Sequence, residues 1–282
     1  MMRFSNAVKI LLSASSATLG VTLLGYCYRI PKAAEFHIET KPQESKQNTW
    51  NHNWDCRDPT ALINPKKLQS LSSSGDNSEI VELLQRVTPS STRNLFFIRH
   101  GQYVTQEKLD EHRKLTQLGK EQAICTGIRL RDFGHKYEQI LESSMTRAIE
   151  TSSFIQKQVK DAPVHRTDLL KEGSPINPDP GFKEWRPERN VFVDGPRIEA
   201  AFRKIVHRAE PSQKSDSYEI IVCHANVIRY FVCRALQLPP EAWLRLSLKH
   251  GSITCLSIYP DGFVTLKCLG EAGHIPSDKL SS

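Results

Sequence analysis

The sequence predicts an α/β domain of three layers, in which a mostly parallel sheet carries helices on both faces. Two observations lead to this prediction. From about residue 94 onward, short apolar runs alternate with stretches whose apolar residues recur every three or four positions. Several of these runs are continuously apolar, which is typical of strands buried on both faces of a parallel sheet. Strands that alternate with helices in this way belong to the α/β class.

The elements are expected in a regular order along the chain. The expected strands and extended segments lie at 95–100, 139–142, 164–170, 218–224, 252–259 and 263–269. The expected helices lie at 116–133, 145–159, 196–207 and 225–238. Pro196 would open the third of these helices, because proline is tolerated in the first turn. The last two strands are joined by Pro-Asp-Gly, which predicts a terminal hairpin.

An uncharged stretch, residues 10–28, precedes this domain within an N-terminal segment of residues 1–30. Its nineteen residues are close to the roughly twenty that cross a bilayer as a helix. We therefore expect a transmembrane anchor that contacts the membrane through residues 10–28. A cleaved targeting segment is the alternative, because the stretch is rich in Ser, Ala and Gly. Basic residues flank both ends, so the flanking charge does not set an orientation.

Residues 31–93 are polar and show little periodicity, which predicts a linker with one short helix at 78–87. The linker contains an unusual segment at residues 50–55, Trp-Asn-His-Asn-Trp-Asp. Each tryptophan offers a large apolar surface that needs a partner to cover it. The two side chains could fold back on their own domain or dock on another subunit, and composition favours neither.

Charge and cysteine content exclude several classes of protein. The chain has 38 basic and 31 acidic residues, a net charge of +7, which is compatible with an anionic partner such as phosphate or a membrane surface. We expect no nucleic-acid partner, because no RNP-like aromatic signature, finger spacing or heptad repeat accompanies the charge. The seven cysteines form no CxxC pair and no Cys/His spacing, so neither a disulfide scaffold nor a structural metal site is expected.

Polar side chains gather where the expected strands end. Ligands of open α/β sheets bind beyond the carboxyl ends of the strands. Five residues fall at or just after such ends: Arg99, His100, Arg147, Glu172 and His224. Each alone is more often structural, but their occurrence at one edge of the same sheet predicts a site there.

These five residues suggest phosphoryl transfer without a metal or another cofactor. Imidazole is a nucleophile at neutral pH, so His100 could attack phosphorus while Arg99 and Arg147 neutralise the phosphate oxygens. His224 would add a hydrogen bond or positive charge to the same oxygens. Glu172 would protonate the leaving oxygen and then activate water against the phosphohistidine. Gly101 would let the phosphate approach the backbone closely.

Four motifs carry a resemblance to a known family. Arg99-His-Gly101 after an apolar strand is similar to the RHG signature of the histidine phosphatase superfamily, also called phosphoglycerate-mutase-like. Residues 115–123 resemble its LTxxGxxQA helix, residues 143–151 its SxxxRAxET turn, and residues 223–226 its second-histidine block. The resemblance covers about residues 94–271 and implies a phosphatase domain at 94–282.

Within that superfamily the chain resembles the membrane-anchored mitochondrial serine/threonine phosphatases. The segments that carry this narrower resemblance are 168–176, 195–203, 224–230 and 243–247. It implies hydrolysis of phosphoserine and phosphothreonine in proteins through a phosphohistidine. It also implies a single-pass location in a mitochondrial membrane, with the outer one favoured, and a homo-oligomer of assembling dimers that is activated by oligomerisation through the tryptophan segment.

The resemblance assigns a role to each matching position. The catalytic positions are His100 as nucleophile, Glu172 as acid and base, and His224 as second histidine; the phosphate-binding positions are Arg99 and Arg147. The oligomerisation positions are Trp50, Asn53, Trp54 and Asp55. Asn51 and His52 depart from the Asp and Pro that the family segment carries, which puts activation by assembly in question.

Two alternatives remain. One is a small-molecule phosphatase or mutase; a mutase usually has a longer insert than the 76 positions between Arg147 and His224. The other is a membrane-tethered scaffold with a vestigial site, which the intact catalytic positions argue against.

Overall fold

The computed structural model describes residues 50–74, 77–181 and 187–282. The expected anchor at 10–28 lies outside these residues. Within the described ranges, no helix is both long enough and apolar enough to cross a membrane.

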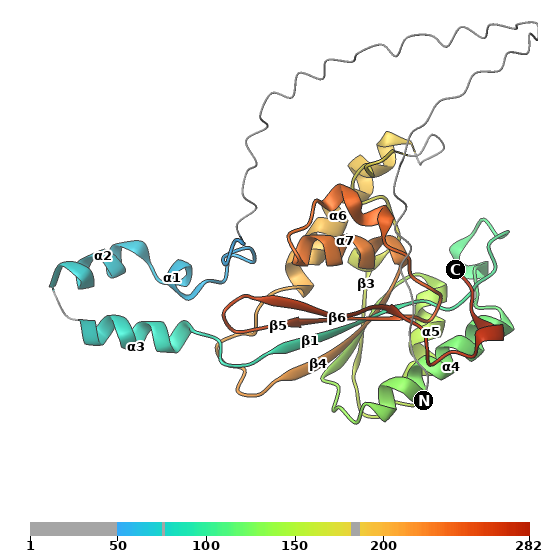
Figure 1. Ribbon diagram of the computed structural model, residues 1–282, viewed down its shortest axis with the longest axis horizontal. Coiled ribbons are helices and arrows are strands. Elements are labelled where there is room, and N and C mark those ends of the chain that lie inside the picture. Colours follow the sequence, from blue (N-terminus) through green and yellow to red (C-terminus); the bar gives the residue numbers. More distant parts are fainter. Residues whose placement is uncertain (1–49, 75–76, 182–186) are drawn as a thin grey trace, which may run out of the picture. The chain divides into compact units, whose positions relative to one another are not determined.

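The sheet has six strands in the order β3-β2-β4-β1-β5-β6 (Figure 1). Their bounds are β1 Arg93–Arg99, β2 Gln139–Ser143, β3 Val164–Thr167, β4 Ser217–Cys223, β5 Ile253–Ile258 and β6 Val264–Glu271. The first four are parallel, whereas β5 is antiparallel to both β1 and β6. The expected strands and the terminal hairpin are confirmed, and the sheet is mixed.

Helices cover both faces of this sheet, which confirms the three layers (Figure 1). One face packs against α6 and α7, and the other against α4 and α5. The bounds are α4 Gln117–Asp132, α5 Thr146–Gln156, α6 Glu188–Ile205 and α7 Ala225–Ala235, with 3-10 turns at Asp110–His112, Asp168–Leu170, Pro240–Arg245 and Ser277–Lys279.

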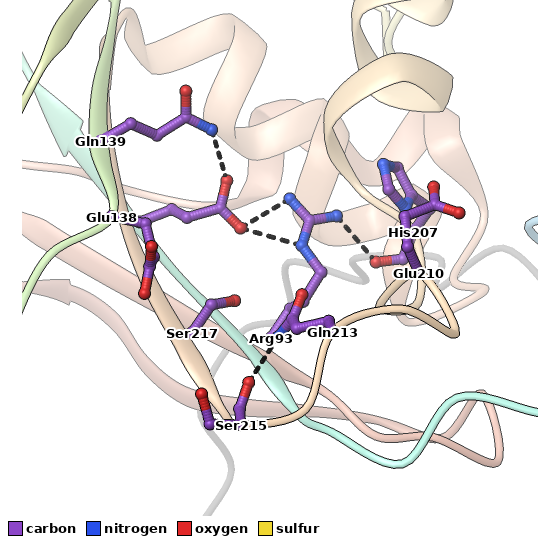
Figure 2. A pocket seen from close by; sticks show the side chains of 9 residues that line it. Arg93, Glu138, Gln139, His207, Glu210, Gln213, Ser215 and Ser217 are labelled. Atoms are coloured by element: carbon purple, nitrogen blue, oxygen red, sulfur yellow. Dashed lines mark hydrogen bonds and ion pairs between the residues drawn. The ribbon is translucent and has the colours of Figure 1, made fainter.

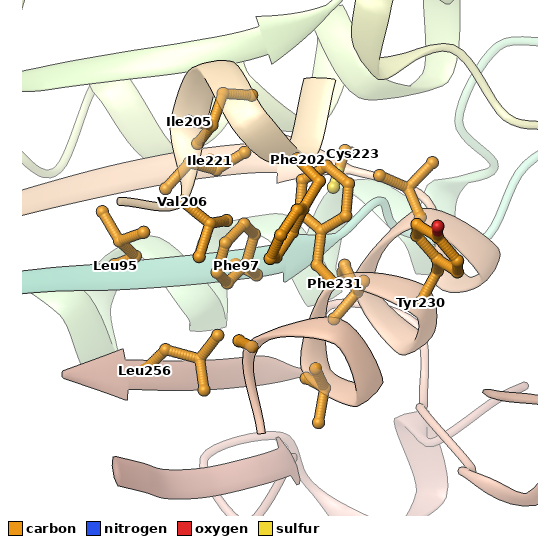
Figure 3. Packing of buried hydrophobic residues seen from close by; sticks show 14 of the residues in the cluster. Leu95, Phe97, Phe202, Ile205, Val206, Ile221, Cys223, Tyr230, Phe231 and Leu256 are labelled. Atoms are coloured by element: carbon orange, nitrogen blue, oxygen red, sulfur yellow. The ribbon is translucent and has the colours of Figure 1, made fainter. Parts of the chain in front are cut away.

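Strand β1 is buried on both faces. Leu95 and Phe97 point into the core beneath α6 and α7, and Phe96 and Ile98 point into the core on the other face. The ring of Phe97 meets the edge of Phe231 in α7 at a centroid distance of 5.8 Å (Figure 3). This packing holds the carboxyl end of β1 in a fixed position.

Two expected elements have different bounds in the structure. Helix α6 begins at Glu188, eight residues before the expected start, and Pro196 lies inside it. The proline costs the helix one backbone hydrogen bond, but the helix continues because its buried face packs on the sheet. The segment expected to be extended to residue 170 leaves the sheet at Thr167, whose hydroxyl accepts a hydrogen bond from the N–H of Leu169 and starts a 3-10 turn.

The described part of the linker contains three helices rather than one. They are α1 Pro59–Leu62, α2 Pro65–Ser74 and α3 Asn77–Val87, of which only α3 was expected. The side chain of Asp58 accepts from the N–H of Thr60, and that of Asn64 accepts from the N–H of Lys66. An acidic or amide side chain followed by proline therefore starts both α1 and α2. These two helices were not expected because the linker sequence shows little helical periodicity.

Candidate active site

The ends of β1, β4 and β2 bring four of the predicted residues together. Arg99 is the last residue of β1 and pairs with Cys223 of β4. The N–H of His100 then donates to the carbonyl of Cys223 over 3.1 Å, which places His100 beside His224 with ring centroids 5.1 Å apart. Arg147 lies in the first turn of α5, directly after β2.

His100 has a defined tautomer. Its Nδ1 lies 2.8 Å from the carbonyl oxygen of Gly101, so Nδ1 carries the hydrogen that this acceptor requires. Nε2 therefore has a lone pair, and it accepts from Nε of Arg147 over 3.2 Å. His100 is 2% exposed; this burial, with the neighbouring His224 and Arg147, holds its pKa well below the usual 6.5. The imidazole is neutral at pH 7 and its Nε2 is a competent nucleophile.

Arg147 is fixed by contacts on several sides. Its Nη1 pairs with Asp110 at 3.3 Å, and its guanidinium lies 4.6 Å from the ring centroid of Tyr103. Asp110 is held in turn by the backbone N–H of Thr146, 2.8 Å from Oδ2. Burial lowers the pKa of Arg147, which is only 2% exposed.

Arg99 is held by the segment that precedes β5. Its Nη1 donates to the carbonyl of Leu248 over 2.6 Å, and its Nη2 lies 3.0 Å from Nε2 of His250. The Nε atom is buried and has no hydrogen-bond partner among the described residues. Burial, followed by the charge of Arg229, lowers the pKa of Arg99 to about 10, so the side chain remains a cation at neutral pH.

Glu172 faces the same cations. Its negative charge acts on Arg99, Arg147 and Arg229 and opposes the lowering of their pKa values by burial. One carboxylate oxygen accepts from the N–H of Gly173 over 3.0 Å. Three guanidinium groups thus face two carboxylates, Glu172 and the Asp110 that pairs with Arg147, and the remaining positive charge favours an anionic ligand.

His224 is completely buried. Its Nε2 lies 2.8 Å from the hydroxyl of Ser143 at the end of β2. Its Nδ1 has no hydrogen-bond partner among the described residues. Burial, followed by the charge of Arg147, keeps the pKa of His224 well below 6.5.

The glycine of the RHG motif has a packing role that the sequence analysis did not anticipate. A Cβ atom on Gly101 would lie 2.4 Å from the carbonyl oxygen of Gly119 in α4. A Cβ on Gly119 would lie 1.9 Å from the carbonyl oxygen of Gln102. The two glycines let α4 pack directly on the backbone that follows His100, so a reason for Gly101 besides phosphate approach is the contact with this helix.

Four residues of the site were missed by the sequence analysis: Tyr103, Asp110, Arg229 and His250. Arg229 lies just beyond the second-histidine block, within the segment 224–230 that carries the narrower resemblance, and could have been included. His250 does not follow a strand; it precedes β5. Because β5 is antiparallel to β1, the amino end of β5 meets the carboxyl end of β1. A residue that precedes the first strand of the expected hairpin could therefore have been considered for the site.

The tryptophan segment packs on its own domain. Trp54 Nε1 donates to the carbonyl of Gly262 over 2.8 Å, and Trp50 packs 5.7 Å from Phe263. The carboxylate of Asp55 accepts from the backbone N–H, Nε and Nη2 of Arg208. Of the two alternatives for the tryptophans, the structure therefore shows the contact within the chain. The oligomerisation role of these residues stays a prediction.

Asn51 and Asn53 have contacts of their own. The Asn51 N–H donates to the side chain of Gln237 over 2.9 Å, and Asn51 Oδ1 accepts from the N–H of Asn53. The side chain of Asn53 accepts from the N–H of Asp58. These bonds shape the turn that presents both tryptophans.

A cavity of about 440 Å³ borders Arg99 and His250. Most of the residues that line it have polar side chains, and none has a carboxylate side chain: Arg99, Gln102, Tyr103, Val104, Thr105, Gln106, Thr116, His250 and Ser282. A second cavity of similar volume lies at the opposite end of the strands, around Arg93 (Figure 2). There Glu219 accepts from Arg93 Nε over 2.8 Å, so the cation is neutralised and an anion is not favoured. Among the described residues, no cluster of three or more His, Cys, Asp or Glu side chains could hold a metal ion.

Comparison with known proteins supports this picture. The sequence profile of the histidine phosphatase superfamily (branch 1) matches residues 95–186 and 195–269. The chain is 47% identical over 270 residues to the mitochondrial serine/threonine-protein phosphatase PGAM5 of Xenopus laevis, covering 95% of each chain. It is 51% identical over 233 residues to the Homo sapiens protein of the same name, covering 82% of this chain and 80% of that protein.

The solved structure of Bacillus stearothermophilus YhfR has the same fold. It superposes with a TM-score of 0.51 at 18% identity, covering 65% of this chain and all of that chain. The site geometry, the profile match and the identity to these relatives agree: the chain belongs to branch 1 of the histidine phosphatase superfamily.

Proposed function

We propose that this protein hydrolyses phosphoserine and phosphothreonine in proteins through a phosphohistidine on His100, without a metal ion. The observation that carries the proposal is the neutral Nε2 of His100 in contact with Arg147. Arg99, Arg147 and Arg229 supply the positive charge that a transferring phosphoryl group requires. The relatives at about half identity are named serine/threonine-protein phosphatases, which supports the choice of substrate.

In the first step, the lone pair of His100 Nε2 forms a bond to phosphorus while the bond from phosphorus to the serine or threonine oxygen breaks. Glu172, which takes up a proton when the dianionic phosphate binds beside it, gives that proton to the leaving oxygen. Arg99 and Arg147 bind the phosphoryl oxygens. The Nδ1 of His224, which has no hydrogen-bond partner among the residues that the structure describes, would donate to one of these oxygens.

In the second step, water replaces the alcohol. The Glu172 carboxylate accepts a proton from the water, whose oxygen bonds to phosphorus as the bond to His100 Nε2 breaks. Inorganic phosphate leaves, and both His100 and the Glu172 acid are restored. The defined tautomer is preserved through the cycle because Nδ1 keeps its hydrogen bond to Gly101.

The location and assembly of the protein are part of the proposal. Relatives at about half identity are named mitochondrial, which supports a mitochondrial location. Residues 10–28 would anchor the chain once in a membrane, with the outer one favoured. A homo-oligomer of dimers would form through Trp50, Asn53, Trp54 and Asp55. Because Trp54 packs on Phe202 near the end of α6, a contact between subunits at this segment would affect the catalytic domain.

The test is phosphate release by the full chain in detergent, from a phosphothreonine peptide and from 3-phosphoglycerate, with EDTA present. We expect turnover of the peptide that disappears in His100→Ala and persists in the control His135→Ala. Turnover of 3-phosphoglycerate alone would instead indicate a small-molecule phosphatase. A folded assembly that turns over neither compound would indicate a scaffold.

A further inference from the structure

His250 joins the phosphate-binding Arg99 to a distant part of the chain, residues 277–282. Arg99 Nη2 lies 3.0 Å from Nε2 of His250. A guanidinium group can only donate, so Nε2 carries no hydrogen and accepts. The hydrogen of the neutral ring is then on Nδ1, which lies 2.9 Å from the hydroxyl oxygen of Ser281. In this chain of contacts, His250 Nε2 is an acceptor, His250 Nδ1 is a donor and the Ser281 hydroxyl oxygen is an acceptor.

Ser281 is itself held in place. Gln122 of α4 donates from Nε2 to the Ser281 hydroxyl oxygen over 2.9 Å and to the carbonyl of Lys279 over 2.7 Å. Its Oε1 accepts from the N–H of Gln102, which fixes the orientation of the amide. The backbone N–H of His250 also donates to the carbonyl of Ser281 over 3.0 Å. The segment is thus attached to both α4 and His250.

Arg99 depends on these contacts for its orientation. Its other partner is the carbonyl of Leu248, 2.6 Å from Nη1. Nη1 and Nη2 of Arg99 are held by Leu248 and His250, which precede β5. The Nε of Arg99 has no partner among the described residues, so its hydrogen could be donated to a ligand. Without the His250 contact, the guanidinium plane could turn about its bond to Leu248 and lose its alignment with a phosphate.

We propose that residues 277–282 form a positioning element of the phosphate site, in which Ser281 orients His250 and His250 orients Arg99. The inference rests on the proposed function only in taking Arg99 as a phosphate ligand. His250 and Ser281 are positioning residues, because they act on phosphate through Arg99. Burial and the charge of Arg99 lower the pKa of His250 to about 3, which keeps the ring neutral and able to accept.

The test measures orthovanadate and inorganic phosphate binding by thermal-shift titration of the full chain, alongside KM and kcat for a phosphothreonine peptide. Ser281→Ala removes the acceptor for His250 Nδ1 and should weaken vanadate binding about three- to tenfold. We expect KM to rise by a similar factor and the melting temperature without ligand to fall by a few degrees, because the buried Nδ1–H of His250 loses its acceptor. Ser281→Thr should restore binding, and Ser277→Ala, in the same segment but exposed, is the matched control.

A double variant distinguishes positioning from a general loss of stability. His250→Phe should weaken vanadate binding at least as much as Ser281→Ala, and combining the two should add nothing, because both break one chain of contacts. His250→Gln, whose amide oxygen can accept from Arg99, should recover part of the affinity.

The outcomes separate this inference from the proposed function. Vanadate affinities within twofold of wild type in Ser281→Ala and His250→Phe, in a chain that turns over the peptide, would overturn the inference alone. A wild-type chain that hydrolyses no peptide but binds phosphate, more weakly in Ser281→Ala, would overturn the proposed function and support the inference. A wild-type chain that binds neither anion would overturn both.

Discussion

The Nε atom of Arg147 donates a hydrogen bond to Nε2 of His100 over 3.2 Å. The atom that would attack phosphorus is therefore already in contact with a cation that would bind the phosphoryl oxygens. The hydrogen bond from His100 Nδ1 to the carbonyl of Gly101 fixes the ring, and the lone pair of Nε2 therefore stays directed toward Arg147.

Arg147→Lys should lower kcat about 100- to 1,000-fold, the usual effect of removing one oriented donor from a developing anion. Lysine keeps the charge but loses the planar fork that reaches His100 and Asp110 together. Steady-state kinetics with the phosphothreonine peptide measure this effect, and Arg166→Lys, on the edge strand β3, is the control. A kcat within tenfold of wild type in Arg147→Lys would show that charge alone suffices.

The site could be predicted from sequence wherever a residue follows a parallel strand. Arg99, His100 and His224 come directly after buried apolar runs, and the edge of the sheet brings such ends together. His250 could not be found by this rule, because it lies at the start of an antiparallel strand and its partner, Ser281, is 31 residues away.

The packing of the tryptophan segment could not be predicted for a different reason. It depends on Arg208, which follows α6 and has the sequence context of a solvated cation. In the structure Arg208 is buried, because Asp55 and the carbonyl of His52 satisfy its donors. Neither partner is near it in sequence, and the local pattern carries no trace of the pair. The start of α6 could not be predicted for a related reason: Pro196 indicates a helix boundary, but packing of the helix on the sheet extends it back to Glu188.

The stability of the fold should decrease as the pH falls from 7.5 to 5.5. His100, His224 and His250 are buried and their pKa values are lowered, to about 3 for His250. In this range the unfolded chain, whose histidines titrate near 6.5, binds protons that the folded chain does not. The contribution of these buried histidines to the free energy of unfolding is therefore fully present above pH 6.5 and decreases as the pH falls below 6.5.

Each such histidine should contribute a slope approaching about 1.4 kcal/mol per pH unit below pH 6.5. Urea unfolding of wild type and His250→Gln at several pH values measures the slope. We expect a smaller slope in His250→Gln, and no change in the control His112→Gln, which replaces an exposed histidine. Equal slopes in all three proteins would show that His250 takes up its proton in the folded state.

The ion pair between Asp55 and Arg208 should anchor the tryptophan segment, because both side chains are 1% exposed. Asp55→Asn leaves the Arg208 cation buried without a counter-charge, which typically costs about 3–5 kcal/mol. The Arg208 contacts lower the pKa of Asp55 against the effect of burial, in agreement with a pair that is stable as charges. Asp58→Asn is the matched control, since asparagine also caps a helix and Asp58 lies nearby at the start of α1.

Chemical denaturation and a sizing column should then report two different consequences of Asp55→Asn. A loss of stability with an unchanged oligomer would assign the segment to the fold of its own domain. A loss of the proposed homo-oligomer at nearly unchanged stability would mean that Asp55 acts mainly between subunits. Because Trp54 packs 5.9 Å from Phe202, near the end of α6, we expect Trp54→Ala to shift stability in the same direction as Asp55→Asn. Opposite shifts would show that the two residues do not act as one segment.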